Sequence, residues 1–322
     1  MKKAVVLGAT GGTGTVIIAE LLRRGIEAVA FGRSLHKLEG LAATLGNPVG
    51  LTLKTGDVFK ENDITAASLG ADVIFHSAAM PYNEMTTRLL PMGEAVMQAA
   101  NNLGIKVIAV DGIYAYGKRT NEHPIDEDYP KNPHTKKGKI KLEFERMFFS
   151  SRWDRTQRMI VRLPDYYGPT ANEASYLGST LESIAAGKPA LFVGNMKVAR
   201  EYVYLPDAAV MIVELASRDE AYGQNWNIPG GGILSGREIV HIAQQASGKS
   251  KLVLPMGKMG LSLLGLFLPV MKEVVEMLYL TEEPLVLSGK KYERLVGPIP
   301  ATSFEQGITE TIQAIMSRGA NA

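Results

Sequence analysis

A cluster of glycines and threonines near the start of the chain is the first group of residues whose types and spacing could do chemistry. Within residues 4–14 the glycines follow a Gly-x-x-Gly-x-x-Gly spacing, and they are Gly8, Gly11, Gly12 and Gly14. Thr10 and Thr13 add hydroxyl groups to the same segment. Glycines let backbone N–H groups come close to a diphosphate, whose negative charge is favoured at the start of a helix. The spacing is a variant of the dinucleotide-binding fingerprint.

The residues on either side of this turn support that interpretation. A short apolar run at residues 4–7 precedes the glycines, and a helix-like pattern follows at residues 16–24. This order predicts a first strand, a tight turn and the N-terminus of a helix. We therefore expect the segment to bind the diphosphate of a dinucleotide.

A second apolar run, at residues 28–31, indicates which dinucleotide is bound. Gly32, Arg33 and Ser34 follow it, where an enzyme that uses NAD usually carries Asp or Glu to accept from the ribose 2′-hydroxyl. A guanidinium suits a 2′-phosphate because it forms paired, charge-assisted hydrogen bonds. We predict that Arg33 and Ser34 favour NADP(H) over NAD(H). The alternative is that Arg33 is a solvated loop charge.

Composition excludes several other kinds of site. The chain has 322 residues, 46% of them hydrophobic and 21% charged, and a net charge of +2, so we expect no nucleic-acid partner. It has no cysteine, which excludes disulfides, thiol nucleophiles and thiolate ligands, and its five histidines are not at metal-ligand spacing. We predict no metal. The apolar run near the N-terminus is too short for a secretion signal, which favours the cytoplasm.

Strand-like and helix-like segments alternate through the first half of the chain. Further short apolar runs precede polar or glycine-containing segments, and they lie at residues 51–54, 73–75, 106–110 and 159–162. Residues 89–102 have the spacing of an amphipathic helix. Repeated strand–helix units predict an α/β fold with a doubly wound parallel sheet, which binds its ligands at the carboxyl ends of the strands.

The pattern changes after Gly168 and Pro169, where isolated helices and glycine turns replace the regular alternation. We therefore predict a dinucleotide-binding domain over residues 1–170 and a smaller, mainly substrate-binding mixed domain over residues 171–322. Residues 199–228 are expected to return to the first domain. Ser235, followed by Glu238, is expected to cap a helix.

Several short motifs occur in an order that resembles a known family. They are the glycine turn, residues 56–58, residues 73–79, Tyr116-Gly117, residues 162–164 with 167–169, residues 200–203 with Asp207, and residues 226–228. The chain resembles the extended short-chain dehydrogenase/reductases, the NAD(P)-dependent epimerase/dehydratase family, over nearly its whole length. This resemblance implies a Rossmann-type fold and oxidoreductase or epimerase chemistry.

The resemblance also implies positions for residues that contact the cofactor. By this comparison Asp57 and Val58 should flank the adenine, and Ala78 and Ala79 should line the ribose and nicotinamide side. Pro164 should border the nicotinamide.

The chain departs from the family at the expected catalytic centre. Active members carry Ser or Thr together with Tyr-x-x-x-Lys on a helix, where the lysine and the cofactor lower the pKa of the tyrosine. Lys139, in a helix expected over residues 135–148, matches the family lysine, but Thr135 stands four positions before it. The other register, Lys141 with Lys137, also lacks the tyrosine. Gly112 stands where the family has Ser or Thr. The chain is thus expected to be an atypical member.

Other residues are candidates to replace the missing groups. Asp111, at the end of a predicted strand, is a candidate base if burial raises its pKa, and Tyr114 follows it closely. Thr135 can only donate or accept a hydrogen bond. Lys139 is expected to hold the hydroxyls of the nicotinamide ribose.

Four residues are predicted to contact the substrate. Tyr82, Tyr166 and Tyr167 follow predicted strands, where aromatic side chains could line a pocket. Arg200 matches the position that in nucleotide-sugar members of the family meets a substrate phosphate. An ion pair near Glu201 is the alternative for Arg200.

An uncharged apolar stretch runs through residues 259–271. It is shorter than the roughly 20 residues needed to span a bilayer. We interpret it as an internal helix pair or a contact in a homodimer, rather than as a membrane-surface segment or a cover over an apolar substrate.

Two functions from different classes remain open on the sequence. The first is an NADP(H)-binding oxidoreductase or epimerase-like protein that acts on a small carbonyl, hydroxyl or nucleotide-sugar substrate with altered catalytic residues. The second is a non-catalytic protein that senses NADP(H). A membrane-peripheral enzyme with a lipid-like substrate is a third hypothesis.

Overall fold

The alternation expected in the first half of the chain is present in the structure, a computed structural model that describes residues 1–171, 175–265 and 269–320. The strands of the large sheet are β1 (Lys3–Leu7), β2 (Glu27–Gly32), β3 (Leu51–Thr55), β4 (Val73–His76), β5 (Lys106–Gly112), β6 (Arg158–Leu163) and β10 (Asn225–Asn227). The helices that accompany them are α1 (Gly12–Arg23), α2 (Leu35–Thr44), α3 (Glu61–Ser68), α4 (Tyr82–Leu103), α5 (Lys136–Phe148) and α7 (Leu205–Ala216), with the short η1 (Ile113–Tyr116) and η2 (Asp219–Ala221). Each apolar run predicted to be a strand is one, with its ends shifted by a few residues at most.

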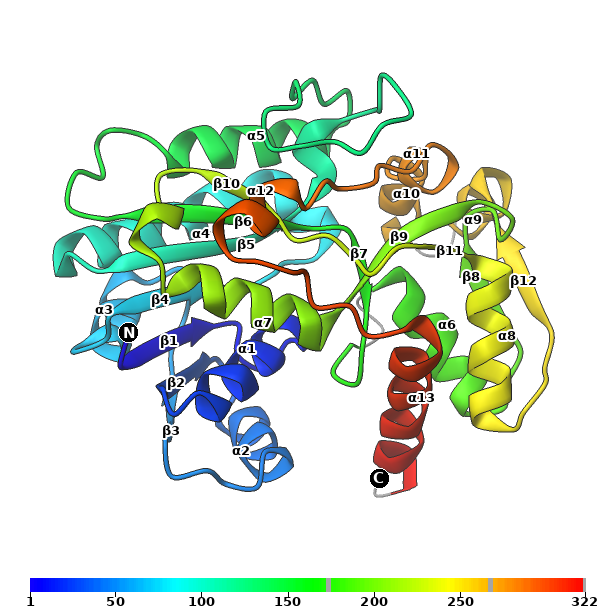
Figure 1. The fold of residues 1–322 in the computed structure, drawn as a ribbon, viewed down its shortest axis with the longest axis horizontal. Helices are drawn as coiled ribbons and strands as arrows, with labels where there is room; N and C mark the ends of the chain where they lie inside the picture. Colours follow the sequence, from blue (N-terminus) through cyan, green and yellow to red (C-terminus); the bar gives the residue numbers. More distant parts are fainter. Residues whose placement is uncertain (172–174, 266–268, 321–322) are drawn as a thin grey trace. The chain divides into compact units, whose positions relative to one another are not determined.

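The large sheet reverses its direction of growth beside β1. Its strand order is β10-β6-β5-β4-β1-β2-β3, and β1 pairs in parallel with both β2 and β4 (Figure 1). Such a reversal creates a crevice at the carboxyl ends of the two central strands, where doubly wound sheets bind their ligands. The predicted fold class is confirmed.

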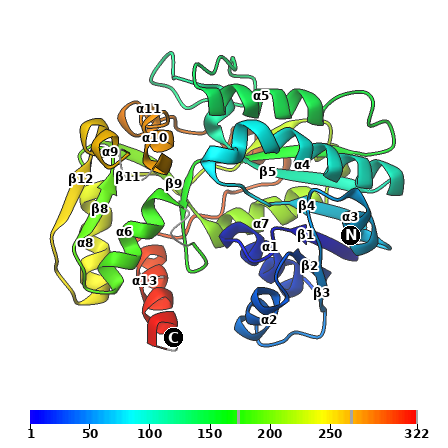
Figure 2. The ribbon, with the colours of Figure 1, turned by 180° about the vertical axis from the view of Figure 1, so that it is seen from behind.

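One face of this sheet packs against three helices. Alternate strand residues such as Val5, Phe31 and Ile74 form a core with apolar residues of α3, α4 and α5 (Figures 1 and 2). The period of two along each strand and the 3.6-residue period of each helix explain why these residues meet. Helix α4 is longer than the predicted residues 89–102, and Pro91 lies inside it.

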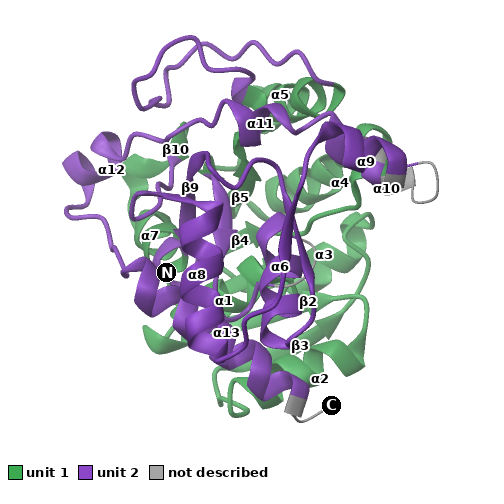
Figure 3. Cartoon of the chain, turned by 90° about the vertical axis from the view of Figure 1, so that its right-hand side faces the viewer, with its two compact units in different colours: residues 1–115, 136–162, 209–226 green, residues 116–135, 163–208, 227–322 purple. Residues whose placement is uncertain are grey.

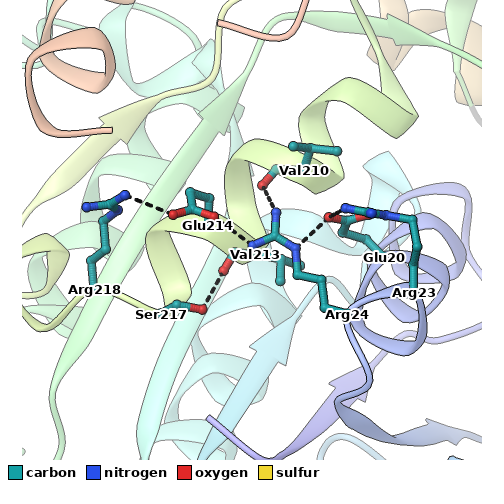
Figure 4. Close-up of polar contacts among 8 residues, drawn as sticks. All are labelled: Glu20, Arg23, Arg24, Val210, Val213, Glu214, Ser217 and Arg218. Carbon is teal, nitrogen blue, oxygen red and sulfur yellow. Dashed lines mark hydrogen bonds and ion pairs between the residues drawn. The ribbon is translucent and has the colours of Figure 1, made fainter. Parts of the chain in front are cut away.

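The opposite ends of α1 have different roles, because its first turn follows the glycines and its last turn is held by ion pairs. The guanidinium of Arg24, just after the last residue of α1, contacts Glu20 at 2.6 Å, Glu214 at 2.7 Å and the carbonyl oxygen of Val210 at 3.2 Å (Figure 4). Arg23 also contacts Glu20. These contacts fix α1 to α7.

The chain divides into two compact units (Figure 3). Unit 1 comprises residues 1–115, 136–162 and 209–226, and unit 2 comprises residues 116–135, 163–208 and 227–322. This division differs from a single boundary at residue 170. Part of the stretch 199–228, residues 209–226, groups with the large sheet, whereas residues 116–135 and 163–170 group with the second unit.

Unit 2 contains two small sheets and several helices. Its strands are β7 (Asp165–Tyr167), β8 (Ala190–Val193), β9 (Ala199–Tyr204), β11 (Ile233–Ser235) and β12 (Val253–Met256), in the orders β11-β9-β7 and β12-β8. Its helices are α6 (Tyr176–Ala185), α8 (Gly236–Ser247), α9 (Lys258–Leu264), α10 (Pro269–Val275), α11 (Tyr279–Glu282), α12 (Lys290–Leu295) and α13 (Phe304–Ala320). Ser235 caps α8 in a capping box with Glu238, as predicted.

The apolar stretch at residues 259–271 lies largely on α9 and α10, which contact each other. The sequence predicts this pair of helices, but the pair is not wholly internal, because Met259 and Leu263 on α9 are exposed. Residues 266–268 lie outside the described residues. Within the described ranges, every helix is too short or too polar to cross a bilayer.

Candidate active site

The glycine turn is built so tightly that side chains are excluded from two of its positions. Gly8 has a φ of +78°, and a Cβ atom placed there would lie 2.6 Å from the Cα atom of Ala78. A Cβ atom on Gly14 would lie 2.3 Å from the carbonyl oxygen of Gly8. Because both contacts are with backbone, neither position tolerates another residue without displacement. The turn and the predicted cofactor residue Ala78 are therefore brought together.

The helix that follows the turn suits an anion. Helix α1 begins at Gly12, after Gly11 as the N-cap residue, and its first turn contains no acidic side chain. Thr10 is exposed and Thr13 is half-buried. The first N–H groups of a helix lack partners within it and carry a partial positive charge. A diphosphate fits the chemistry of this turn.

Arg33 and Ser34 lie where β2 leads into α2. The side chain of Arg33 is exposed. The hydroxyl of Ser34 accepts a hydrogen bond from the backbone N–H of Lys37 at 3.3 Å and so caps α2. Ser34 thus has a structural role, whereas the guanidinium of Arg33 is accessible to a ligand.

Asp57 and Val58 follow β3 and shape the next loop. The carboxylate of Asp57 accepts from the backbone N–H of Phe59 at 3.0 Å, and its own N–H donates to Asp63 at 2.9 Å. Val58 packs against the core. Since β1, β2, β3 and β4 are parallel neighbours, the segments after them lie at one edge of the sheet. The glycine turn, the loop of Asp57 and Val58, and Ala78 therefore lie at the same edge of the sheet, within unit 1.

A buried network of charges lies at the carboxyl ends of β5 and β6. Asp111 has a nearly inaccessible side chain whose Oδ1 atom lies 2.5 Å from Nζ of Lys141 and whose Oδ2 atom lies 3.1 Å from Nη1 of Arg162. Arg162 also donates from Nη2 to Glu145 at 2.7 Å, and Asn225 donates to Glu145 at 2.6 Å. Two cations thus balance two carboxylates, which offsets the cost of burying them.

This network corrects the expected ionisation of Asp111. Burial alone would raise its pKa, but the charges of Lys141 and Arg162 outweigh burial and lower the pKa below its ordinary value. The expectation that burial makes Asp111 a base with a raised pKa is therefore wrong. Its carboxylate is held ionised by two cations.

The lysine of α5 that reaches the buried charge network is Lys141, whereas the sequence favoured Lys139. Lys139 is exposed, whereas Lys141 contacts Asp111 and the side chain of Lys137 is fully buried. Lys137 and Lys141 are four residues apart, so they share one face of the helix. Thr135 is buried in unit 2, where its side chain contacts Tyr279. The geometry favours the register of Lys141 with Lys137.

The four-residue spacing of a tyrosine and a lysine does occur elsewhere, at Tyr114 and Lys118. Helix η1 ends at Tyr116, and Gly117 follows with a φ of +80°. One helix therefore does not carry both side chains. The sequence of α5 itself contains no tyrosine.

Two tyrosines predicted for different roles contact each other. The hydroxyl oxygens of Tyr82, in the first turn of α4, and Tyr114, in η1, are 2.5 Å apart. Their rings are stacked with centroids 6.4 Å apart. The Nζ atom of Lys137 lies 5.4 Å from the centroid of the Tyr82 ring. The structure thus places a phenol pair and a buried cation together.

His76, the last residue of β4, is fully buried. Burial lowers its pKa to about 4, and the charge of Lys141 acts in the same direction. Its Nδ1 atom has no hydrogen-bond partner among the residues that the structure describes. A histidine held neutral in this way is suited to a structural role. His134 is exposed and contacts the ring of Tyr279 in unit 2.

The remaining predicted site residues lie in unit 2. Arg200 is buried, with its guanidinium carbon 5.4 Å from the Phe192 ring centroid and 5.2 Å from that of Tyr202. Its Nε atom and Oδ2 of Asp165 lack hydrogen-bond partners within the described part of the chain. Glu201 does not pair with Arg200, because its carboxylate accepts from the backbone N–H groups of Gly230 and Leu287.

The predicted aromatic residues of unit 2 differ in accessibility. Tyr166 is half-buried, and burial raises its pKa to about 12. Tyr167 is buried against Tyr204 and Phe304. Tyr167 therefore belongs to the core of this unit. The roles predicted for Tyr166 and Pro164 stay predictions.

The sequence interpretation named Lys141 with Lys137 only as an alternative register and assigned no role to Arg162 or Glu145. A signal for the helix residues was present, because Lys137 and Lys141 continue the apolar stripe of Phe144 and Phe148 at helical spacing. Arg162 carried a weaker signal, as a charged residue directly after the apolar residues 159–161 of β6.

Comparison with known proteins places this geometry in a family. Residues 4–229 match the model of the NAD dependent epimerase/dehydratase family. A UDP-glucose 4-epimerase of Rickettsia conorii is 30% identical over 123 residues, which are 34% of this chain and 36% of that protein. The match therefore spans about a third of the relative. An uncharacterized UDP-glucose epimerase of Bacillus subtilis is 23% identical over 77% of this chain and 83% of its own.

Solved structures share the fold over the whole chain. The UDP-glucuronic acid 4-epimerase of Bacillus cereus in complex with NAD has a TM-score of 0.78 at 19% identity, covering 99% of both chains. The dTDP-glucose 4,6-dehydratase DesIV of Streptomyces venezuelae has a TM-score of 0.81 at 20% identity, covering 99% of this chain and 98% of its own. The family match extends through the glycine turn, the charge network and the phenol pair. The chain belongs to the NAD-dependent epimerase/dehydratase family.

Proposed function

We propose that unit 1 binds a nicotinamide dinucleotide and that the chain is an oxidoreductase or epimerase-like enzyme with altered catalytic residues. The observation that carries the proposal is the glycine turn, where Gly8 and Gly14 permit close backbone contacts at the start of a helix without acidic residues in its first turn. The diphosphate would lie on this turn, and Asp57, Val58, Ala78 and Ala79 would flank the base and the ribose. When bound, the nicotinamide accepts or donates a hydride.

The coenzyme is proposed to be NADP(H). The support is the accessible guanidinium of Arg33 directly after β2 and the absence of a carboxylate at the end of that strand. The solved relatives named above hold NAD, so the coenzyme is a point on which this chain would differ from them.

The lysine that binds the nicotinamide ribose is proposed to be Lys141 rather than Lys139. Lys141 lies on the inner face of α5 beside Lys137 and Asp111, whereas Lys139 is exposed. By forming an ion pair with Asp111, Lys141 is held in place before any ligand arrives.

The substrate is proposed to be a small carbonyl or hydroxyl compound attached to a phosphate, such as a nucleotide sugar. Arg200 supports this class because its guanidinium is buried beside two aromatic rings, with Nε lacking a hydrogen-bond partner among the described residues. A buried cation of this kind is stabilised by an anionic ligand. The relatives compared above are named as enzymes of UDP-sugars or of a dTDP-sugar.

Calorimetric titration with NADPH and NADH tests this proposal. Wild-type protein should bind NADPH more tightly than NADH, and Arg33→Ala should reduce that difference about tenfold or more, since it removes a charge-assisted contact. Gly14→Ala should abolish binding of both, because its Cβ atom meets the carbonyl oxygen of Gly8. Gly40→Ala is the control, as a helical glycine with open space around it. If neither coenzyme binds to wild-type protein, the proposal fails.

A non-catalytic sensor of NADP(H) is the second candidate. It is favoured by the sequence of α5, which carries Lys137 four residues before Lys141 instead of a tyrosine. Binding of NADPH without turnover on a panel of carbonyl compounds and nucleotide sugars would support this candidate over the enzyme.

A further inference from the structure

The proposed chemistry requires a group that can take up and release a proton, and α5 does not supply a phenol for it. The inner face of this helix carries Lys137 and Lys141. Asp111 is unsuited to the task, because two cations lie against its carboxylate and lower its pKa. His76 is held neutral by burial. The proton-transfer group must come from another element.

Tyr82 and Tyr114 supply phenols from two other elements. Tyr82 lies shortly after β4 and Tyr114 shortly after β5, and these strands are parallel neighbours in the sheet. Both side chains are half-buried, so they are neither sealed in the core nor fully solvated. Their hydroxyl oxygens are 2.5 Å apart. A separation of this size is a short hydrogen bond, in which either hydroxyl could be the donor.

Two phenols in such contact release their first proton more easily than a single phenol does. After one proton leaves, the remaining hydroxyl donates to the phenolate and stabilises it. Release of the second proton becomes harder, because it would create two adjacent negative charges. The pair therefore behaves as one acid with one exchangeable proton.

A buried cation lies beside the pair. The Nζ atom of Lys137 is 5.4 Å from the centre of the Tyr82 ring, and the ammonium favours the ionised form of a nearby phenol. The charge network near the carboxyl ends of β5 and β6 also lies on the elements around it, and its charged groups are Asp111, Lys141, Arg162 and Glu145. His76 of β4 is the buried titratable group next to this network. Of these, Asp111 is paired with both Lys141 and Arg162, so its charge is largely compensated.

We propose that Tyr82 and Tyr114 form the acid–base pair of the reaction, with Lys137 stabilising its ionised form. This inference rests on the proposed function. In the oxidising direction, the ionised pair takes the proton of a substrate hydroxyl as its C–O bond becomes a carbonyl, and an oxidised nicotinamide, when bound, would supply the acceptor for the hydride. In the reducing direction, the pair returns its proton to the carbonyl oxygen as the hydride arrives. Protons and electrons balance in both directions.

Titration of phenolate absorbance tests the pair without any turnover. Among the 12 tyrosines of the chain, one should ionise well below the ordinary value of about 10. That step should disappear in both Tyr82→Phe and Tyr114→Phe, and should move to higher pH in Lys137→Met. Tyr222→Phe is the control, because the Tyr222 hydroxyl donates to the carbonyl oxygen of Ala216 and burial raises its pKa. The tyrosine ionisation below pH 10 should persist in this variant.

The outcomes separate this inference from the proposed function. The proposed pair is overturned if wild-type protein shows no tyrosine that ionises well below pH 10. It is also overturned if that ionisation persists in both phenylalanine variants. Neither result bears on coenzyme binding. If the step is present and NADPH and NADH both fail to bind in the calorimeter, the proposed function fails. With an active substrate, each phenylalanine variant should lower kcat about 10²–10⁴-fold, the usual contribution of acid–base catalysis, and coenzyme affinity should stay within about twofold of wild type.

Discussion

Glu201 shows how one buried carboxylate can join three segments of unit 2. Its side chain, on β9, accepts from the backbone N–H of Gly230 at 2.9 Å and from that of Leu287 at 2.8 Å. Burial raises its pKa to about 8, although the two hydrogen bonds lower it. The carboxyl group is therefore protonated in the folded protein at pH values where it is ionised in the unfolded chain.

This difference predicts that stability decreases as pH rises. The folded state binds the extra proton between the unfolded value of 4.5 and the folded value of about 8, so the free energy of unfolding falls over that interval. Glu201→Gln, which does not titrate, should show a shallower decrease. Denaturant unfolding between these pH values measures the slope, with the exposed Glu293→Gln as the control. Equal slopes in wild type and Glu201→Gln would contradict this account.

The individual residues of the site could be predicted only in part. The close backbone approach at Gly8 and Gly14 was predictable because it requires glycine. The phosphate-binding roles of Arg33 and Arg200 stay predictions. The choice of lysine was harder, because α5 begins with several lysines and their charge does not show which of them faces inward. The burial stripe through Phe144 and Phe148 decides this, and it favours Lys141. The contact of Tyr82 with Tyr114 joins residues 32 positions apart and has no local signature.

At the scale of elements, the join between α1 and α7 determines how firmly the first helix is held. Arg24 binds Glu20, Glu214 and the carbonyl oxygen of Val210, so it links both helices (Figure 4). Of these three partners, Arg23 contacts only Glu20, and 67% of the Arg23 side chain is exposed. The two neighbouring arginines offer a matched comparison.

Arg24→Leu should lower the free energy of unfolding by about 1–3 kcal/mol, because it removes hydrogen bonds to charged groups and leaves Glu20 with fewer partners. Arg23→Leu should cost about 1 kcal/mol or less, as exposed ion pairs do. Urea unfolding of the two variants measures the difference. Similar losses in both would show that the link to α7 contributes little.

Sequence periodicity predicted the elements better than their lengths. Strands β1 to β6 were found from apolar runs because a sheet covered on both faces requires them. Helix α4 was underestimated, since residues 82–88 contain few apolar side chains, and it continues through Pro91. Residues 116–135 group with unit 2 through contacts with distant segments, such as the bonds of Ile125 with Val286 and Ser288. Such pairings leave no mark in the local sequence.

At the scale of the whole molecule, the residues proposed for the coenzyme and for the substrate phosphate belong to different compact units. The glycine turn, Arg33 and Lys141 are in unit 1, whereas Arg200 is in unit 2. Each unit has its own apolar core. The two binding functions should therefore be separable by mutation.

Arg200→Met should raise KM for a nucleotide sugar about tenfold or more, because it removes the cation proposed to meet the phosphate. The affinity for NADPH should not change, since the glycine turn, Arg33 and Lys141 are in unit 1. Steady-state kinetics and calorimetry on one preparation measure both quantities. If the affinity for NADPH fell by the same factor as KM rose, the assignment would be contradicted. The control is Arg237→Met, which changes another arginine of unit 2.

The close approach of Gly8 to Ala78 has a consequence for anyone who wishes to redesign this protein. The loop after β4 rests directly on the backbone of the first turn, and the same loop leads to Tyr82. Lengthening or reshaping this loop to accept a new compound would also displace the glycine turn, which is proposed to bind the coenzyme. Changes in this loop that alter substrate specificity should therefore also affect coenzyme affinity, and such variants have to be tested for both.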